Sequence, residues 1–253
     1  MENRGIRYFI HHLVEVDSTN RYINDEAPSL WDIAGDADAL VVTADLQTAG
    51  RGQRGNIWCS ETGENLLVSI LVRPEFLPVK EQFLLSQITA LAVKDCMKSF
   101  GIDVSLKWPN DIYIGKCKLC GMLLELQFSA TTIEQAIIGV GININQATFP
   151  VIDRTPVSMY QLMGRRYNIN DVLDALLVNF SKYYMMLYEG NVQTIVDEYK
   201  NSLLGMGATM NYRDKDGNFD ATIVEVENDG HLLLQRKNGN ISRYAFKEVE
   251  LLL

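Results

Sequence analysis

Residues 47–58 read QTAGRGQRGNIW, and this glycine- and arginine-rich segment separates two apolar stretches at 39–44 and 66–72. Both stretches have the β-branched and aliphatic composition of buried strands. Glycines let a backbone approach a ligand closely, and arginines add a positive charge that suits phosphate or carboxylate. The segment contains neither a P-loop nor a dinucleotide-binding glycine pattern. A glycine-rich loop between buried strands is nevertheless more often functional than a surface loop with solvated arginines.

Strands and helices are predicted on both sides of this loop. The β-branched and aromatic stretch at 6–16 predicts a strand, and Asp17-Ser18-Thr19-Asn20 supplies N-cap chemistry for a helix after it. Apolar residues at helical spacing predict a long core helix over 78–100. Further strands are predicted at 104–107, 112–114, 122–128 and 133–140, with a hairpin turn at 114–116. Two later helices are predicted, one from an Asn170 N-cap to about 187 and one over 192–203.

The character of the chain changes near Gly205. Short strand-like runs follow, separated by turn signals at 216–218, 229–230 and 238–240. This pattern is typical of a small antiparallel barrel. We therefore expect a larger domain over 1–205 and a smaller one over 206–253.

Composition and charge exclude several classes of protein. The chain has 253 residues, of which 47% are hydrophobic and 22% charged, so whole-chain disorder is excluded. Its apolar runs are far shorter than the ~20 residues that a bilayer requires. Its first residues lack the basic-then-apolar order and the cleavage site of a signal peptide. We therefore expect a cytoplasmic protein without a membrane partner. The net charge of −9 argues against general binding to nucleic acid.

The four cysteines are expected to be free thiols, as is usual for a cytosolic chain. Cys117 and Cys120 form one C-x-x-C pair. A zinc site needs a second pair of ligands at similar spacing, and the histidines do not supply it. We expect neither zinc nor redox chemistry there.

Three further segments have residue types suited to ligand binding. The segment 107–111 reads KWPND, in which Lys107 could meet phosphate and Asp111 could meet Mg²⁺ or a nucleophile; the alternative is a turn with a solvated lysine. In 118–125, KLCGMLLE, Lys118 opens an apolar strand and Gly121 leaves room beside it. That lysine either anchors a ligand carboxylate or is a charged residue that keeps an edge strand from pairing with other chains. The segment 139–145, GVGININ, suggests a strand beside a pocket, although close strand packing also explains its glycines.

In this order and spacing, the four segments resemble the biotin protein ligase family. The family pattern G-R-G-R-x-G-x-x-W-x-S-x-x-G-x-N corresponds to 50–65, and K-W-P-N-D to 107–111. K-x-x-G-[IM]-L-x-E corresponds to 118–125, and G-I-G-x-N-x-N to 139–145. The family's early S-T-N is matched at 18–20 and its Q-x-x-G at 47–50. The resemblance covers the chain from about residue 14 onward.

The resemblance implies an α+β fold, with a class II aminoacyl-tRNA synthetase-like mixed-sheet catalytic domain and a C-terminal SH3-like β-barrel. It implies an ATP-dependent biotin–[biotin carboxyl carrier protein] ligase, which forms biotinyl-5′-AMP and transfers biotin to a lysine of the carrier domain of a carboxylase such as acetyl-CoA carboxylase. The resemblance thus implies biotin and ATP as substrates and Mg²⁺ as a cofactor. A homodimer is compatible with the resemblance. The DNA-binding domain of some members has no counterpart, so the ligase-only type is expected.

The same resemblance implies residue roles. Lys118 is expected to contact the biotin carboxyl group, with Arg51 and Lys107 as further catalytic cations. Asp111 is expected to face the nucleotide and its metal and to orient or deprotonate the acceptor lysine. The expected biotin and nucleotide contacts are Ser18, Thr19, Asn20, Gln47, Gly50, Gly52, Gln53, Arg54, Trp58, Asn110, Gly121, Gly141 and Asn143.

One position departs from the family pattern. Gln53 stands where the family has its second arginine. Either Arg51 and Arg54 compensate when the loop orders over the ligand, or biotinyl-AMP is retained poorly. Two other functions are weighed against the ligase, namely a lipoate–protein ligase and a non-catalytic biotin-binding sensor. K-W-P-N-D argues against the first, and the intact set of Lys107, Asp111 and Lys118 against the second.

Overall fold

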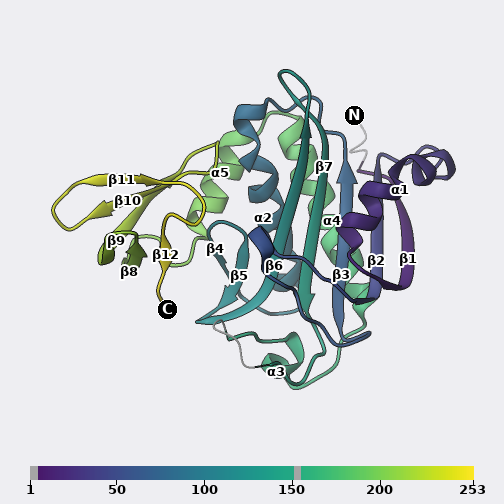
Figure 1. Ribbon diagram of the computed structural model, residues 1–253, viewed down its shortest axis with the longest axis horizontal. Coiled ribbons are helices and arrows are strands. Elements are labelled where there is room, and N and C mark those ends of the chain that lie inside the picture. Colours follow the sequence, from purple (N-terminus) through teal and green to yellow (C-terminus); the bar gives the residue numbers. More distant parts are fainter. Residues whose placement is uncertain (1–4, 151–154) are drawn as a thin grey trace.

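The computed structural model describes residues 5–150 and 155–253 and contains a seven-stranded and a five-stranded sheet (Figure 1). The larger sheet has the order β1-β2-β3-β7-β6-β5-β4. Its strands are β1 (Tyr8–Val16), β2 (Ala39–Gln47), β3 (Asn65–Val72), β4 (Ser105–Lys107), β5 (Asp111–Ile114), β6 (Cys117–Phe128) and β7 (Ile133–Asn143). Strands β1 and β2 are parallel, and the other neighbouring pairs are antiparallel. The predicted mixed sheet is therefore confirmed.

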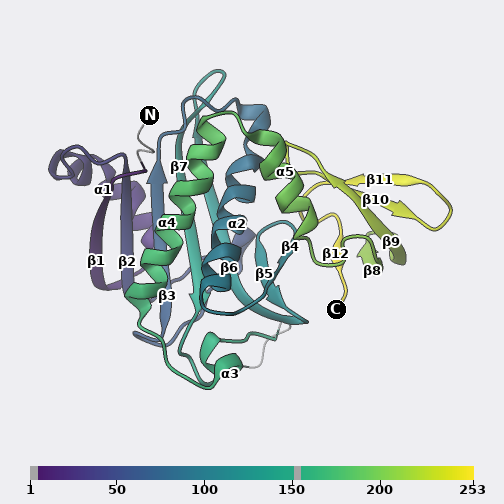
Figure 2. The same cartoon turned by 180° about the vertical axis from the view of Figure 1, so that it is seen from behind.

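Helices cover both faces of this sheet. Helices α2 (Phe83–Ser99), α4 (Ile169–Tyr188) and α5 (Val192–Asn201) lie on one face, which Figure 2 shows from the helical side. Helix α1 (Thr19–Ile33) connects β1 to β2 and packs on the opposite face. Side chains alternate along β2 in agreement with this arrangement, because Val41 joins the α2 core whereas Leu40 and Val42 pack against α1. The short helix α3 (Met159–Met163) precedes α4.

A hollow forms on the α1 face because three neighbouring strands carry small residues there. Ser69 of β3 lies opposite Gly139 of β7, and Gly141 of β7 lies opposite Gly121 of β6. Successive residues of a strand point to opposite faces, so these four positions fall together on one face. The lack of side-chain volume at these positions leaves space beside α1, and this space becomes the candidate site.

The C-terminal sheet is antiparallel throughout and has the order β11-β10-β9-β8-β12. Its strands are β8 (Thr209–Asp214), β9 (Gly217–Val226), β10 (Leu232–Arg236), β11 (Ile241–Tyr244) and β12 (Glu250–Leu251). One hydrophobic core includes residues of α2, α4 and this sheet, among them Tyr212 and Ile223. The small domain and its boundary at 205 stay predictions, because the core continues across that position.

Local details differ from the sequence-based expectations at two helix starts. The helix predicted over 78–100 is divided into a 3₁₀ turn at Val79–Glu81 and α2, which begins at Phe83. Helix α4 is capped by Asn168 rather than Asn170, because the Asn168 side chain accepts a hydrogen bond from the Asn170 backbone N–H. The four cysteines are free thiols, as expected. Within the described ranges, no helix combines the length and apolar character needed to cross a bilayer.

Candidate active site

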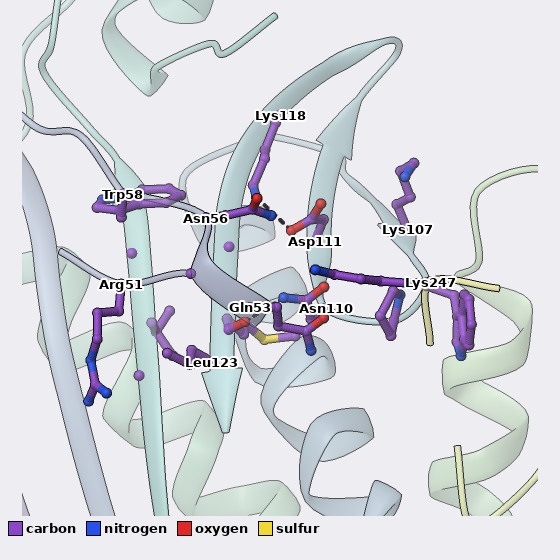
Figure 3. A pocket seen from close by; sticks show the side chains of 18 of the residues that line it. Arg51, Gln53, Asn56, Trp58, Lys107, Asn110, Asp111, Lys118, Leu123 and Lys247 are labelled. Carbon is purple, nitrogen blue, oxygen red and sulfur yellow. Dashed lines mark hydrogen bonds and ion pairs between the residues drawn. The ribbon is translucent and has the colours of Figure 1, made fainter. Parts of the chain in front are cut away.

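A cavity of about 340 Å³ lies on the α1 face of the larger sheet and extends to the C-terminal sheet (Figure 3). Its wall includes the start of α1, the end of β2, the loop after β2, the β4–β5 turn and strands β6 and β7. The residues expected from the sequence that line it are Ser18, Thr19, Asn20, Gln47, Arg51, Gly52, Gln53, Trp58, Lys107, Asn110, Asp111, Lys118, Gly121 and Gly141. Segments separated by more than 100 residues in the chain thus meet at one site.

Two expected residues, Gly50 and Asn143, are not part of the cavity wall that the structure describes. Gly50 lies behind Trp58, because a Cβ on Gly50 would come within 2.5 Å of the Trp58 carbonyl oxygen. Asn143 is buried and donates to the backbone oxygen of Val157 at 3.2 Å and to that of Lys118 at 3.4 Å. Asn143 therefore supports the strand that carries Lys118. The side chain of Arg54 lies outside the described part of the structure.

The centre of the site is an ion pair between Lys118 and Asp111. The two residues lie on adjacent strands of the β5–β6 hairpin, and Lys118 Nζ is 2.7 Å from Asp111 Oδ1. The Asp111 side chain is 5% exposed and that of Lys118 is 20% exposed, so the carboxylate is buried and the ammonium reaches the cavity. A partly exposed ammonium held by a buried carboxylate is a suitable receptor for the carboxylate of a ligand.

Trp58 forms a wall of the cavity because two glycines make room for its ring. Its ring lies 5.6 Å from Lys118 Nζ. A Cβ on Gly141 would come within 2.6 Å of Trp58 Cε2, and a Cβ on Gly121 would lie 3.0 Å from both Trp58 Cζ3 and Lys118 Nζ. The room that the sequence indicated beside Lys118 is therefore present, and the indole occupies part of it.

A chain of hydrogen bonds connects the polar residues at the α1 end. Gln47 Oε1 accepts from the Thr19 backbone N–H at 2.8 Å and lies 3.1 Å from the Thr19 hydroxyl. The Ser69 hydroxyl lies 2.8 Å from Thr19 Oγ1 and 2.6 Å from Asn20 Oδ1. Thr19, Asn20 and Ser69 are all buried. This end of the cavity is therefore fixed before any ligand arrives.

The Asn20 side-chain amide donates two hydrogen bonds within the protein. Its Nδ2 group donates to Glu125 Oε2 at 2.7 Å and to the Leu123 carbonyl oxygen at 3.3 Å. Arg51 contacts the same Glu125 oxygen at 3.2 Å. Gly139 accommodates this amide, since a Cβ there would meet Asn20 Oδ1 at 2.3 Å. Asn20 therefore orients Glu125 and Ser69. Figure 3 shows that Arg51 lies away from the Lys118–Asp111 pair.

The K-W-P-N-D segment forms the turn between β4 and β5. Asn110 Nδ2 donates to the Met122 carbonyl oxygen at 2.6 Å, and the Met122 N–H donates to the Asn110 carbonyl oxygen at 2.9 Å, so this residue fixes the turn to β6. Trp108 Nε1 donates to the Gly230 carbonyl oxygen at 2.9 Å, which joins the turn to the C-terminal sheet. Lys107 Nζ lies 5.5 Å from the ring of Tyr113.

Sequence reasoning missed several residues of the site. Ser69 was read as part of an apolar strand, although a lone hydroxyl in LLVSILV could have marked a buried polar position. The C-terminal sheet adds Tyr212, Lys247 and Glu250 to the wall, and no sequence signal pointed to them. The Tyr212 hydroxyl is buried without a hydrogen-bond partner, and burial raises its pKa to about 12.

The site residues do not form a protein-only metal site. Asp111 already holds Lys118 at 2.7 Å, and Glu250, the other carboxylate on the described wall, is 2.6 Å from Arg213. Elsewhere in the described ranges, Glu227, Asp229 and His231 come close enough together for a metal ion, but Arg243 contacts both carboxylates. The donors in the cavity thus do not fit Mg²⁺ by themselves.

Comparisons with known proteins agree on one family. Residues 15–143 match the Biotin/lipoate A/B protein ligase family. The bifunctional ligase/repressor BirA of Bacillus spizizenii is 31% identical over 218 residues, which cover 85% of this chain and 66% of that protein. The biotin–[acetyl-CoA-carboxylase] ligase of Mycobacterium tuberculosis is 28% identical over 227 residues, covering 88% and 81%. This chain therefore spans slightly less than two thirds of the Bacillus relative.

A solved structure extends the likeness to three dimensions. The biotin protein ligase of Aquifex aeolicus, determined in complex with biotin and ATP, has a TM-score of 0.77 and 27% sequence identity. The match covers 96% of this chain and 98% of that one. The similarity therefore includes both the mixed sheet and the C-terminal sheet.

Proposed function

Because the chain belongs to the Biotin/lipoate A/B protein ligase family, we propose that it is a biotin–protein ligase that activates biotin with ATP and transfers it to a carrier-domain lysine. The observation that carries the proposal is the Lys118–Asp111 pair beneath Trp58, in a cavity with a polar α1 end. Relatives named as biotin–[acetyl-CoA-carboxylase] ligases support biotin over lipoate. The expected SH3-like barrel and the synthetase-like character of the larger domain belong to the same proposal.

The arrangement of the strands suggests how the substrates lie. Ser18, Thr19 and Gln47 are next to β1 and β2, whereas Lys118 and Asp111 are on β6 and β5, further across the sheet. Biotin has a largely apolar body and a polar ureido edge, so its ring fits the α1 end, where a few hydroxyl and amide groups interrupt apolar side chains. Its carboxylate then reaches Lys118. The nucleotide lies beyond, over the β4–β5 turn.

In the first step the biotin carboxylate attacks the α-phosphorus of ATP, which forms biotinyl-5′-AMP and releases pyrophosphate. Two anions must approach one another, so fixed positive charge at the point of attack lowers the barrier. Lys118 supplies that charge, and the buried Asp111 holds its ammonium in place. Mg²⁺, where present, would be held mainly by the phosphates and would neutralise part of their charge.

In the second step the amine of the acceptor lysine attacks the acyl carbon of the adenylate, and AMP leaves. A lysine with an ordinary pKa near 10.4 is neutral in well under ~1% of molecules at pH 7. A carboxylate that orients the amine and accepts its proton therefore helps. We assign this role to Asp111. Asp111→Asn is then expected to slow single-turnover transfer more than adenylate formation.

The direct test is to incubate the protein with biotin, ATP, Mg²⁺ and a biotin carboxyl carrier domain and to measure the intact mass of the carrier. A gain of one biotinyl group that requires ATP supports the proposal, and replacing biotin with lipoate tests the second candidate. If biotin binds but no biotinyl-AMP forms, the chain is a sensor rather than an enzyme.

The Gln53 position is tested in the same assay. If poor retention follows from the missing arginine, Gln53→Arg should slow the release of biotinyl-AMP. Unchanged release would mean that other cations already hold the intermediate.

A further inference from the structure

Lys247 lies between β11 and β12 and lines the cavity from the side of the C-terminal sheet. Figure 3 shows its side chain extending from that sheet into the cavity toward Asn110. The position places a positive charge on the wall opposite the α1 end, at the far side of the Lys118–Asp111 pair. No motif in the sequence singled out this residue.

The backbone at Lys247 is unusual. Its φ is +71°, and it is the one residue other than glycine with a positive φ in the described ranges. This left-handed region suits glycine and disfavours a lysine because of its Cβ. A residue held in such a conformation at a ligand cavity suggests that its side chain is used there.

Two of the other cations that line the cavity are held by carboxylates, and Lys107 lines the wall as well. Lys118 is 2.7 Å from Asp111 and Arg51 is 3.2 Å from Glu125. Gln53, on the loop wall, is uncharged, whereas the resemblance to the ligase family leads one to expect an arginine there. A triphosphate carries several negative charges and needs cations along its length. Gln53 leaves its position on the loop wall uncharged, and a cation on the facing wall supplies the charge from the other side.

We propose that Lys247 is a nucleotide-binding residue that contacts the β- and γ-phosphates of ATP and takes over the charge absent at Gln53. The proposal rests on the proposed function, because that function places the nucleotide at this end of the cavity. Lysine suits the role as a compact charge on a flexible stem, which can follow phosphates that depart as pyrophosphate. Because AMP lacks those two phosphates, Lys247 should distinguish ATP from AMP.

The test is to measure the dissociation constants of ATP and AMP for the biotin-free protein by calorimetry, so that no adenylate forms during the titration. Lys247→Asn and Lys247→Gly remove the charge, and both residues tolerate a positive φ, so the fold should be kept. We expect ATP to bind about tenfold more weakly to both variants, and AMP and biotin to bind as before. Lys247→Arg should retain the affinity for ATP. Lys237→Asn makes the same charge change at an exposed pair with Asp220 outside the cavity and should change nothing.

The outcomes separate this proposal from the proposed function. Unchanged ATP affinity in Lys247→Asn, or an equal loss for ATP and AMP, would overturn the role of Lys247. A wild-type protein that forms no biotinyl-AMP would overturn the proposed function, while the comparison of ATP with AMP would still decide the role of Lys247.

Discussion

At the α1 end of the cavity the polar side chains bind one another, whereas at its centre and on its loop side the charged side chains are held in ion pairs. Thr19, Asn20 and Ser69 are buried and joined by hydrogen bonds. Lys118 and Arg51, in contrast, are partly exposed and rest on Asp111 and Glu125. The first region keeps its shape without a ligand, and the second can exchange a protein carboxylate for a ligand anion.

The difference shows why residues of one motif need not share a role. Ser18-Thr19-Asn20 and Lys118 were all expected to contact substrates. The Asn20 amide donates to Glu125 and to the Leu123 carbonyl oxygen, so Asn20 fixes the pocket wall. A buried polar group that loses its partner carries the full penalty of desolvation, so such positioning residues should affect stability more than an exposed ion pair does.

The largest expected effect comes from breaking the central pair. Lys118→Ala removes the charge proposed to hold the biotin carboxylate and leaves Asp111 buried without it. We expect biotin-dependent pyrophosphate release to fall by about 10³-fold and the free energy of unfolding to fall by about 3 kcal/mol. The double variant Lys118→Met with Asp111→Asn should recover stability without recovering activity. Pyrophosphate release near the wild-type rate in Lys118→Ala would contradict the assignment.

A change at the α1 end should affect stability first. Asn20→Ala leaves the Ser69 hydroxyl and Glu125 without a shared partner, so unfolding should become easier by about 2 kcal/mol. Asn24→Ala on the same helix is the matched control, because Asn24 is exposed and should change stability by less than about 0.5 kcal/mol. Chemical denaturation of both variants checks this. Equal losses in the free energy of unfolding would mean that the buried network contributes no more to stability than an exposed asparagine does.

The packing of Trp58 provides a third comparison. Gly141→Ala places a Cβ within 2.6 Å of Trp58 Cε2, so the indole must move from the wall. We expect biotin to bind about tenfold more weakly while the free energy of unfolding changes by about 1 kcal/mol. In a Trp58→Leu background the same substitution should have little further effect, which a double-mutant cycle measures. Additive losses would show that Gly141 acts independently of Trp58.

The smallest effect concerns the cysteines. Burial raises the pKa of the Cys96 thiol to about 12 and raises that of Cys120, so both should stay protonated and react slowly with iodoacetamide. Cys59 is exposed and follows Trp58 in the loop. We expect Cys59 to be labelled first, and biotin with ATP to slow its labelling a few-fold if the loop orders. Mass spectrometry of the native protein gives the order of labelling.

The sequence was sufficient for the strands and for most of the site, because both depend on local patterns. Alternating and aliphatic runs located β2, β3 and β7, and charged residues in short motifs located Lys118 and Asp111. It was not sufficient for Ser69 or Lys247. Which face Ser69 occupies depends on strand register, and the reach of Lys247 into the cavity depends on how two sheets meet. The sequence also could not show that Asn143 donates to the Val157 carbonyl oxygen, since that contact depends on how the segment after β7 folds back.

The contact of Trp108 with the C-terminal sheet has a thermodynamic consequence. Its indole donates to the Gly230 carbonyl oxygen and its ring lies 5.3 Å from that of Phe246, which in turn lies 5.9 Å from Phe83 of α2. The two sheets therefore share one interior. Heating should melt them together in a single calorimetric transition, and a chain cut at residue 205 should lose the turn that carries Asn110 and Asp111 along with the removed sheet.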